Sequence, residues 1–495
     1  MLNALKFQTN LTRTENGAAA YRSTESHCLD LFASAGAMRN RSDEDLEIMF
    51  FRAYAESPDL AMKLLFFIRD IRGGLGERRI FRTMLTSLTR THPESVKKNL
   101  PYVAEYGRFD DLLPLLDTPC RNAVVAVIRE VLEEDLKALG NGGHVSLLGK
   151  WLPSVNTSSR ETVRYARILA RALGMNDAEY RKTCTKLRHA IGILENNLRT
   201  GDYTFDYSAQ PAKAMLKYRK AFLRNDEERY LDFMNAVQDG TAKLNTGTLY
   251  PYEIIAPFCE DCWDSPRLTE EEARVMDTTW NALPDYTCGD NALCVIDGSG
   301  SMYGAPYGTN TTISPASVAL SLGIYFAERN TGLFHNHFIT FSERPQLVEI
   351  KGDDIATKVE YCKGFDEVAN TNLLSVFCLI LDAAVKHNLP QEEMPSALYI
   401  ISDMEFDYCT RDSDETVFEI AKAAFSEQGY ELPRVVFWNV ACRNSHQPVT
   451  MHESGTMLLS GASPKLFELA ASGGVDAYDF MLKTLNSPRY GKISA

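Results

Sequence analysis

The chain has 495 residues, 45% of them hydrophobic, and its 52 basic and 66 acidic side chains give a formal net charge of −14. This length allows two or more domains, and the composition is that of an ordinary soluble globular protein rather than a disordered or fibrous one. No apolar run approaches the roughly 20 residues that a membrane-spanning helix needs, so we expect no membrane contact.

The start of the chain and the cysteines indicate where the protein resides. The opening Met-Leu-Asn-Ala-Leu-Lys lacks the basic region and apolar core of a secretory signal. The 11 cysteines are an odd number with little paired spacing, which favours reduced thiols over disulfides. We therefore expect a cytoplasmic protein.

Charge is distributed unevenly along the chain. Residues 1–280 hold 38 basic and 39 acidic side chains, a net of −1, whereas residues 281–495 hold 14 and 27, a net of −13. The C-terminal part should repel phosphate groups, so any polyanion would have to be held by the N-terminal part.

The predicted elements begin with a weakly patterned region at residues 1–41. It is polar, and Gly17-Ala-Ala-Ala and Ala33-Ser-Ala-Gly suggest an extended N-terminal arm. From Ser42 the pattern becomes helical, because this cap residue is followed by three acids and then by apolar residues at helical spacing.

Short amphipathic helices then alternate with turns as far as residue 283. Further helices are predicted over residues 122–139, 159–173, 177–194, 213–223, 226–237 and 269–280. This alternation predicts an α-helical, HEAT-like solenoid over residues 42–283.

Residues 284–495 are predicted to form a second domain. After a linker over residues 284–290, strands alternate with helices, which predicts parallel strands with crossover connections and a doubly wound, Rossmann-like α/β sheet. The predicted strands span residues 292–296, 333–340, 346–350, 397–402, 435–440 and 457–459, and the predicted helices span residues 314–328, 353–359, 372–387, 414–427, 465–471 and 475–485.

Oxygen-bearing side chains follow the first of these strands. Asp297, Ser299 and Ser301 alternate with glycine on the loop after an apolar run, at the carboxyl end where open α/β sheets place their ligands. Hard oxygen donors without neighbouring nitrogen or sulfur suit Mg²⁺ or Mn²⁺ better than zinc. The alternative is a serine-rich turn whose hydroxyls only cap the following helix.

Two later segments supply further oxygen donors. Thr371 adds a hydroxyl, and Asp403 ends a second apolar strand. The order Asp-x-Ser-x-Ser, Thr, Asp resembles the metal-ion-dependent adhesion site of von Willebrand factor A domains. This resemblance implies a site built from Asp297, Ser299, Ser301, Thr371 and Asp403, with a position left open for a partner's carboxylate.

A set of motifs extends the resemblance over nearly the whole chain, from about Leu46 to about Leu469. It comprises Arg-Asp-Ile-Arg-Gly-Gly-Leu-Gly-Glu-Arg at 69–78, Tyr-Gly-Arg-Phe-Asp-Asp-Leu-Leu at 106–113, Lys-Trp-Leu-Pro-Ser at 150–154, Gly-Thr-Leu-Tyr-Pro-Tyr-Glu-Ile at 247–254, Asp-Gly-Ser-Gly-Ser-Met at 297–302, Ile-Ser-Asp-Met-Glu-Phe-Asp at 401–407 and Val-Phe-Trp-Asn at 436–439. In this order the motifs resemble the family of domain of unknown function 2828. That family in turn resembles the Ro autoantigen proteins, in which a TROVE ring of HEAT-like helices is closed by a von Willebrand A domain.

The resemblance to Ro proteins implies a ribonucleoprotein component. Ro proteins bind small structured noncoding RNAs on the outside of the ring and single-stranded ends of defective RNAs in its hole. Two departures are visible here: the chain is acidic overall, and Asn372 follows Thr371 where many relatives have Asp.

Two basic faces are the best candidates for RNA contact in the helical part. Each places four cations at i, i+4, i+7 and i+11, opposite an apolar face, so that they could neutralise phosphates. An ordinary solvated face is the alternative. The two sets are Arg160, Arg164, Arg167 and Arg171, and Lys213, Lys217, Lys220 and Arg224.

A glycine-rich turn provides a third, weaker candidate. Arg72 and Arg78 flank it next to a helix start, where guanidinium and amide groups could hold a phosphate. The alternative is an interhelical turn in which Arg69 and Asp70 fix neighbouring elements.

Catalysis finds little support in the sequence. Ser299 and Ser301 have no histidine nearby in the chain. We therefore expect no catalytic residues and favour a noncatalytic RNA-binding protein. The alternatives are a metal-dependent protein-interaction adaptor and, third, a metal-dependent hydrolase or nuclease built on Asp297 and Asp403.

Overall fold

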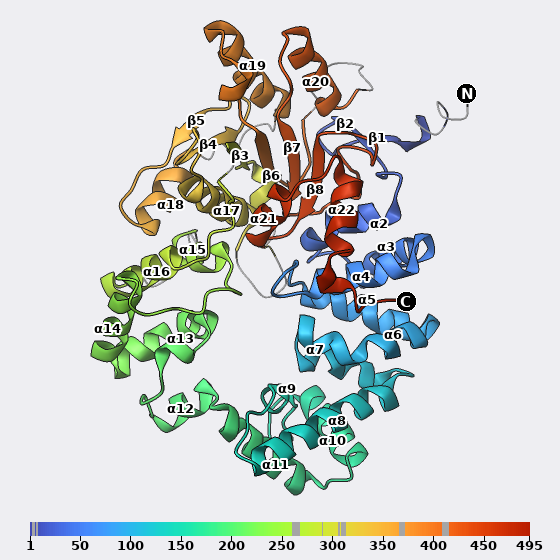
Figure 1. Cartoon of the computed structure of the whole chain (residues 1–495), viewed down its shortest axis with the longest axis vertical. Coiled ribbons are helices and arrows are strands. Elements are labelled where there is room, and N and C mark those ends of the chain that lie inside the picture. Colours follow the sequence, from blue (N-terminus) through green and yellow to red (C-terminus); the bar gives the residue numbers. More distant parts are fainter. Residues whose placement is uncertain are drawn as a thin grey trace.

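The structure is a computed structural model of the chain. In Figure 1 the helices form an arc that leaves one side of a β-sheet domain and returns to its other side. No described helix is long and apolar enough to cross a membrane. The described residues are 1, 5, 8–259, 268–289, 291–304, 307, 313–365, 372–407 and 415–495.

The first half of the arc starts where the sequence predicts. The Ser42 side chain accepts a hydrogen bond from Asp45 N, and Pro58 occupies the first turn of the next helix, a position that needs no N–H donor. The helices are α3 (Asp43–Glu56), α4 (Pro58–Arg69), α5 (Arg78–Thr91), α6 (Pro93–Asn99), α7 (Val103–Tyr106) and α8 (Arg121–Gly140), with 3-10 helices at Leu100–Tyr102 and Phe109–Asp117.

The second half of the arc turns back towards the sheet. One predicted helix is wrong in extent: residues 177–194 divide, because Gly192 adopts a left-handed conformation with φ of 66° and ends the first helix. The helices are α9 (Leu148–Trp151), α10 (Arg160–Ala172), α11 (Asp177–Ile191), α12 (Leu194–Thr200), α13 (Ala212–Asn225), α14 (Glu227–Gln238), α15 (Pro251–Cys259) and α16 (Glu270–Asn281).

Within the described residues, the sheet has six strands in the order β5-β4-β3-β6-β7-β8, all parallel except β5, which pairs antiparallel with β4. The chain passes from β3 to β4 on one side and later to β6 on the other, so the strand order reverses beside β3. The strands are β3 (Ala292–Asp297), β4 (His337–Phe341), β5 (Leu347–Glu349), β6 (Ala397–Ser402), β7 (Arg434–Asn439) and β8 (Thr456–Ser460).

Helices cover both faces of this sheet. Phe467 of α21 contacts Trp438 of β7 on one face, and Phe418 of α20 contacts the adjacent Phe437 on the other, as the alternation of a strand requires. The helices are α17 (Pro315–Arg329), α18 (Ile355–Lys363), α19 (Leu373–His387), α20 (Val417–Glu427), α21 (Lys465–Ala471) and α22 (Ala477–Leu485).

Both ends of the arc pack against the sheet domain. At the N-terminal end α4 contacts α22, and at the other end α15 contacts α17 and α18. Trp280 Nε1 donates a hydrogen bond of 2.7 Å to Glu328 Oε2 of α17. At the end of the chain, Ala495 N donates to Asp59 of α4 at 2.8 Å. The helical arc therefore contacts the sheet domain at both of its ends (Figure 1).

The predicted N-terminal arm is wrong for the described residues. Residues 11–21 form an antiparallel hairpin of β1 (Leu11–Arg13) and β2 (Ala19–Tyr21), and α2 (His27–Ser34) is buried apart from its first residue. Gly17 bridges to Asp407, and Gly36 N donates to Ser460 Oγ of the edge strand β8 at 2.9 Å. The segment folds onto the sheet because its small residues, which suggest an extended arm in the sequence, allow close backbone approach.

Candidate metal centre and basic faces

The two predicted metal-binding carboxylates come together at the carboxyl edge of the sheet. Strands β3 and β6 are adjacent and parallel, with Ile296 opposite Ile401, so Asp297 and Asp403 leave the sheet side by side. Asp297 has no solvent-exposed surface and Asp403 only 2%. The apolar residues of both strands pack between the two helical layers and thereby bury the acids that follow them.

Hydrogen bonds fix the loop after β3. Ser402 Oγ donates to Asp297 Oδ2 at 2.6 Å, and Ser299 N donates to Asp297 Oδ1 at 2.9 Å. The hydroxyls of Ser299 and Ser301 lie 3.0 Å apart. Ser299 therefore lies beside the carboxylate and Ser301 lies next to Ser299. The contact with Ser402 has no counterpart among the predicted ligands.

Burial makes the carboxylate of Asp297 difficult to ionise. Desolvation, followed by the nearby negative charge of Asp403, raises the pKa of Asp297 to about 7. The hydrogen bonds from Ser402 and Ser299 lower the pKa but do not offset burial. A cation placed between the two carboxylates would remove this penalty.

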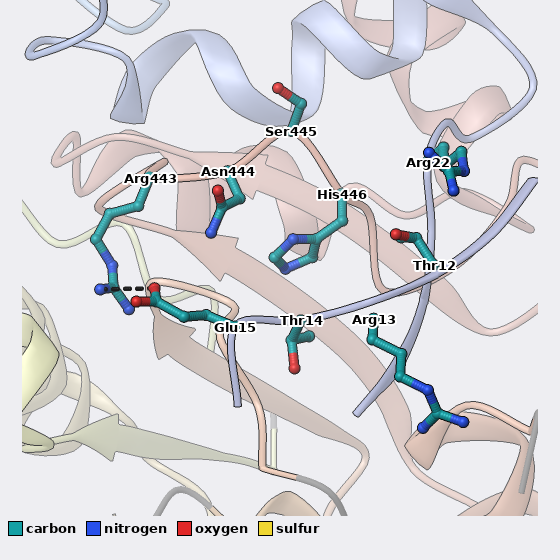
Figure 2. A pocket seen from close by; sticks show the side chains of 9 residues that line it. All are labelled: Thr12, Arg13, Thr14, Glu15, Arg22, Arg443, Asn444, Ser445 and His446. Atoms are coloured by element: carbon teal, nitrogen blue, oxygen red, sulfur yellow. Dashed lines mark ion pairs between the residues drawn. The ribbon is translucent and has the colours of Figure 1, made fainter. Parts of the chain in front are cut away.

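One cationic side chain already reaches the edge of this site. Arg443, on the loop after β7, places Nη2 at 3.1 Å from Asp403 Oδ2 and Nη1 at 2.9 Å from Glu15 Oε2 of the N-terminal hairpin. Figure 2 shows Arg443 extended towards Glu15. The sequence offers no local signal for this arrangement, because its residues come from opposite ends of the chain.

A second acid braces the loop after Asp403. Glu405 is buried and accepts hydrogen bonds from Glu15 N and from Asn444 Nδ2, both at 2.7 Å. Met404 between the two acids has a φ of 66°, which is unusual for a residue with a side chain. The hairpin and the loop that carries Asn444 thus hold the Asp-Met-Glu turn in a conformation that is costly in isolation.

The donor set fits a hard divalent ion. Among the described residues, Asp403 Oδ2 is buried and lacks a well-aligned hydrogen bond, despite the nearby Arg443 guanidinium. With Asp297 and the serine hydroxyls it offers oxygen atoms of the kind that Mg²⁺ and Mn²⁺ prefer. Thr371, the remaining predicted ligand, lies outside the described residues. Across the described ranges, no cluster of three or more His, Cys, Asp or Glu side chains has metal-binding geometry; the predicted site has only two such side chains. Metal binding therefore stays a prediction.

The basic face of α10 is exposed but partly neutralised. All four of its arginines are accessible to solvent. Arg164 forms a two-pronged ion pair with Asp117 at 2.6 and 2.7 Å, and Arg167 lies 3.4 Å from Asp177. Arg160 and Arg171 have no side-chain partner among the described residues. The face therefore presents two uncommitted cations instead of the predicted four.

On the basic face of α13, too, two of the four cations have acidic partners. Lys213 pairs with Glu253, and Lys220 lies 3.6 Å from Glu272. Lys217 Nζ lies 4.9 Å from the centre of the Tyr218 ring without an acidic partner, and Arg224 has no partner within the described ranges. Acids on neighbouring helices cannot be recognised from the pattern of one helix.

The glycine-rich turn serves packing between elements. A Cβ on Gly73 would lie 2.7 Å from Arg489 Nε, and one on Gly74 only 2.1 Å from the Phe67 carbonyl oxygen. Arg69, beside the turn, is buried and pairs with Asp111 at 2.7 Å. These contacts favour the interpretation as an interhelical turn.

The two arginines predicted there to hold phosphate have protein partners. Arg72 donates to the Glu105 carbonyl at 3.0 Å, and Arg78 lies 3.8 Å from Asp110.

Comparisons with known proteins give a family match for each part of the chain. Residues 14–127 and 170–286 match a family described as a domain of unknown function (DUF2828), and residues 291–480 match another described in the same way (DUF7788). The predicted likeness to the first family is confirmed. Its predicted extent is wrong, because the sheet part matches the second family.

Individual relatives span most of the chain. It is 29% identical over 496 residues to an uncharacterised protein of Acanthamoeba polyphaga mimivirus, covering 93% of this chain and 84% of that protein. Among solved structures it is similar to the Ro (RSR) protein of Deinococcus radiodurans, with a TM-score of 0.48, 13% identity, and coverage of 95% of this chain and 100% of that one.

Proposed function

We propose that this chain, with a helical part matched by the DUF2828 family and a sheet part matched by the DUF7788 family, is a noncatalytic RNA-binding protein. In this proposal the arc is a HEAT-like, Ro-like ring. The sheet domain is of von Willebrand A type and holds Mg²⁺ or Mn²⁺. The ligand class is single-stranded RNA ends or small structured noncoding RNA.

The observation that carries the proposal is a set of exposed cations on α10 and α13 without acidic partners. Among the described residues these are Arg160, Arg171, Lys217 and Arg224. A contact with phosphate contributes more binding free energy for such cations than for paired ones, because no existing ion pair must be broken. Two helices of one arc carrying such cations suit a long, charged ligand.

The charge distribution also favours RNA contact by the helical part over contact by the sheet domain. Residues 281–495 carry a net charge of −13, so the sheet domain repels a polyanion, whereas residues 1–280 are nearly neutral overall. Phosphate contacts on the helical part would then dominate RNA affinity.

The metal would act within the sheet domain. Asp297 and Asp403 would hold it with the hydroxyls of Ser299 and Ser301, and it would supply a Lewis-acidic positive charge at the sheet edge. Arg443 and the Ser402 hydroxyl would keep the two carboxylates oriented towards that charge.

Direct binding tests the proposal. Fluorescence anisotropy at low salt should show affinity for a hairpin RNA with a single-stranded tail, and weaker affinity for a blunt duplex of equal length. Affinity should fall steeply as salt rises, because phosphate contacts release counterions. Absence of binding to both RNAs at low salt would refute the RNA-binding function.

A metal-dependent protein-interaction adaptor is the second candidate, favoured by the buried carboxylates at the sheet edge. An adaptor should bind a Glu- or Asp-containing partner in a way that EDTA and Asp297→Ala both abolish. RNA binding through the arc should survive both treatments. The two readouts therefore separate the candidates.

A further inference from the structure

We propose that a cleft between the N-terminal hairpin and the loop after β7 binds a phosphate group, beside the predicted metal site and apart from RNA binding by the arc. The cleft has a volume of about 760 Å³. Figure 2 shows its lining side chains, which come from the two ends of the chain. They are Thr12, Arg13, Thr14, Glu15, Arg22, Arg443, Asn444, Ser445 and His446.

The cleft concentrates positive charge in an otherwise acidic protein. Its lining includes Arg13, Arg22 and Arg443 against one carboxylate, Glu15. A second hollow of about 270 Å³ shares Arg22 and Ser445 with it and adds Arg41 and Arg52, together with the acids Asp30 and Asp45. Asp30 is directed away from solvent, because its carboxylate accepts hydrogen bonds from Ser23 and Thr24. The cleft and the adjoining hollow together are lined by five arginines and three acids, so this surface is basic.

Several of these arginines retain unused donors. Within the described part of the chain, the guanidinium groups of Arg22 and Arg52 are exposed and have no hydrogen-bond or ion-pair partner. Arg41 donates to the Arg443 carbonyl at 2.9 Å and to Ser445 Oγ at 2.8 Å, but its buried Nε has no acceptor in the part of the chain that the structure describes. A buried donor without an acceptor is costly unless a ligand or water completes it.

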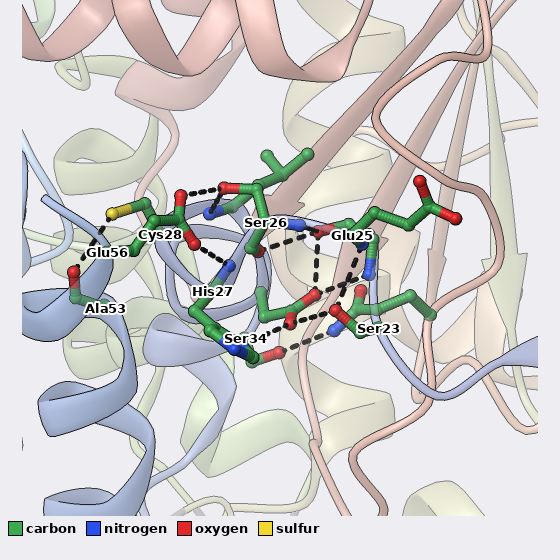
Figure 3. Close-up of polar contacts among 12 residues, drawn as sticks. Ser23, Glu25, Ser26, His27, Cys28, Ser34, Ala53 and Glu56 are labelled. Atoms are coloured by element: carbon green, nitrogen blue, oxygen red, sulfur yellow. Dashed lines mark hydrogen bonds and ion pairs between the residues drawn. The ribbon is translucent and has the colours of Figure 1, made fainter. Parts of the chain in front are cut away.

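The walls of the cleft are held in place. The backbones of Tyr21 and Gln447 exchange hydrogen bonds of 2.9 and 2.7 Å, which join the hairpin to the loop after β7. Beyond Arg22, Ser26 Oγ donates to Glu56 Oε1 of α3 at 2.6 Å, in the network of Figure 3. Arg22 therefore projects from a backbone fixed on both sides, which lowers the entropy cost of binding.

The chemistry of the lining favours phosphate over other anions or bases. Guanidinium groups present paired N–H donors that match phosphate oxygens, and the hydroxyls of Thr12 and Ser445 add neutral donors. Among the lining residues there is no Phe, Tyr or Trp, and the side chain of His446 is only 8% exposed, so the lining offers little surface for stacking a nucleobase. The ligand is therefore a phosphomonoester or diphosphate, either free or at the end of a polynucleotide.

Calorimetry with inorganic pyrophosphate in EDTA tests the site on the full-length protein. The variant Arg22→Gln/Arg52→Gln removes one arginine that lines the cleft and one that lines the adjoining hollow. Neither side chain has a hydrogen bond or ion pair within the described residues, so the fold should persist. Its matched control is Arg90→Gln/Arg199→Gln, which removes one exposed arginine from α5 and one from α12, neither with a hydrogen bond or ion pair among the described residues. Wild type and control should bind pyrophosphate alike, and the cleft variant should bind at least about tenfold more weakly.

Two oligonucleotides distinguish the source of the phosphate. Stronger binding of a 5′-phosphorylated than of a 5′-hydroxyl oligonucleotide, lost in the cleft variant, would assign the site to polynucleotide ends. Equal binding of both, with pyrophosphate still bound in the cleft, would assign it to free phosphate compounds. No pyrophosphate binding at millimolar concentration, or equal loss in the cleft and control variants, would overturn the proposal.

Discussion

The carboxyl edge of the sheet and the basic faces of the arc were both predicted from residue spacing, but the structure treats them differently. At the sheet edge Asp297 and Asp403 lie together, buried and short of counter-charge. On α10 and α13 half of the predicted cations are paired with acids from neighbouring elements. Folding brings the two acids together as their spacing predicts, whereas it leaves only half of the predicted cations without an acidic partner.

The difference follows from what fixes each set of residues. Parallel strands of one sheet must end at the same edge, so two acids that end adjacent strands converge whatever the helices do. A helix face is only one side of an interface, and what lies opposite depends on packing between distant segments. Asp117 and Glu253 illustrate this, since each pairs with a cation more than 35 residues away.

The largest expected effect concerns the sheet edge. Asp297→Ala should reduce Mg²⁺ affinity by at least about 100-fold, because it removes one of two charged ligands. Calorimetric titration of Mg²⁺ into both proteins measures this, with circular dichroism as a check on the fold. Equal affinity in wild type and variant would show that the ion does not bind there.

A second prediction uses the raised pKa of Asp297 with EDTA present. The folded protein holds a proton on Asp297 up to about pH 7, whereas the unfolded chain releases it near pH 4. Stability from this group is therefore lost as pH rises through that window. Asp297→Asn avoids the loss, so its stability relative to wild type should improve between pH 5 and pH 8 by on the order of 2 kcal/mol.

Urea unfolding at both pH values measures that difference, and Asp382→Asn, a change at an exposed acid on α19, serves as control. A relative stability of the Asp297→Asn variant that does not change with pH would contradict the burial of an uncompensated charge.

The smallest effect concerns the ion pairs on the arc. Arg164→Gln breaks an exposed pair with Asp117 and should cost less than about 1 kcal/mol of stability. Arg160→Gln on the same helix should change stability by even less, because that arginine has no partner in the described structure. Thermal unfolding of the two variants side by side would show it. A larger loss for Arg160→Gln would mean that the pairing pattern is wrong.

Regular elements were the most predictable part of the molecule. The strand over residues 397–402 and the helix over residues 465–471 have the predicted bounds, because apolar runs and caps are local signals. Strand β4 starts at His337 instead of residue 333, since Asn336 adopts a φ of 62° in a preceding turn.

Contacts between distant segments escaped prediction. Glu15 and Arg443 meet beside Asp403 only because the N-terminal hairpin folds over the sheet edge. Nothing in the spacing around either residue indicates this neighbour. The same explanation applies to Arg22, whose surroundings are built from both ends of the chain.

In the proposed function, the uncommitted cations on the arc bind RNA. Two variants of equal charge test it: Arg160, Arg171, Lys217 and Arg224 changed to Gln, and Arg164, Arg167, Lys213 and Lys220 changed to Gln. The slope of log K against log salt, measured with a single-stranded RNA, should shrink by up to about 3 in the first variant and by much less in the second. Equal slopes in both variants, or no RNA binding by the wild-type protein, would contradict RNA binding through these cations.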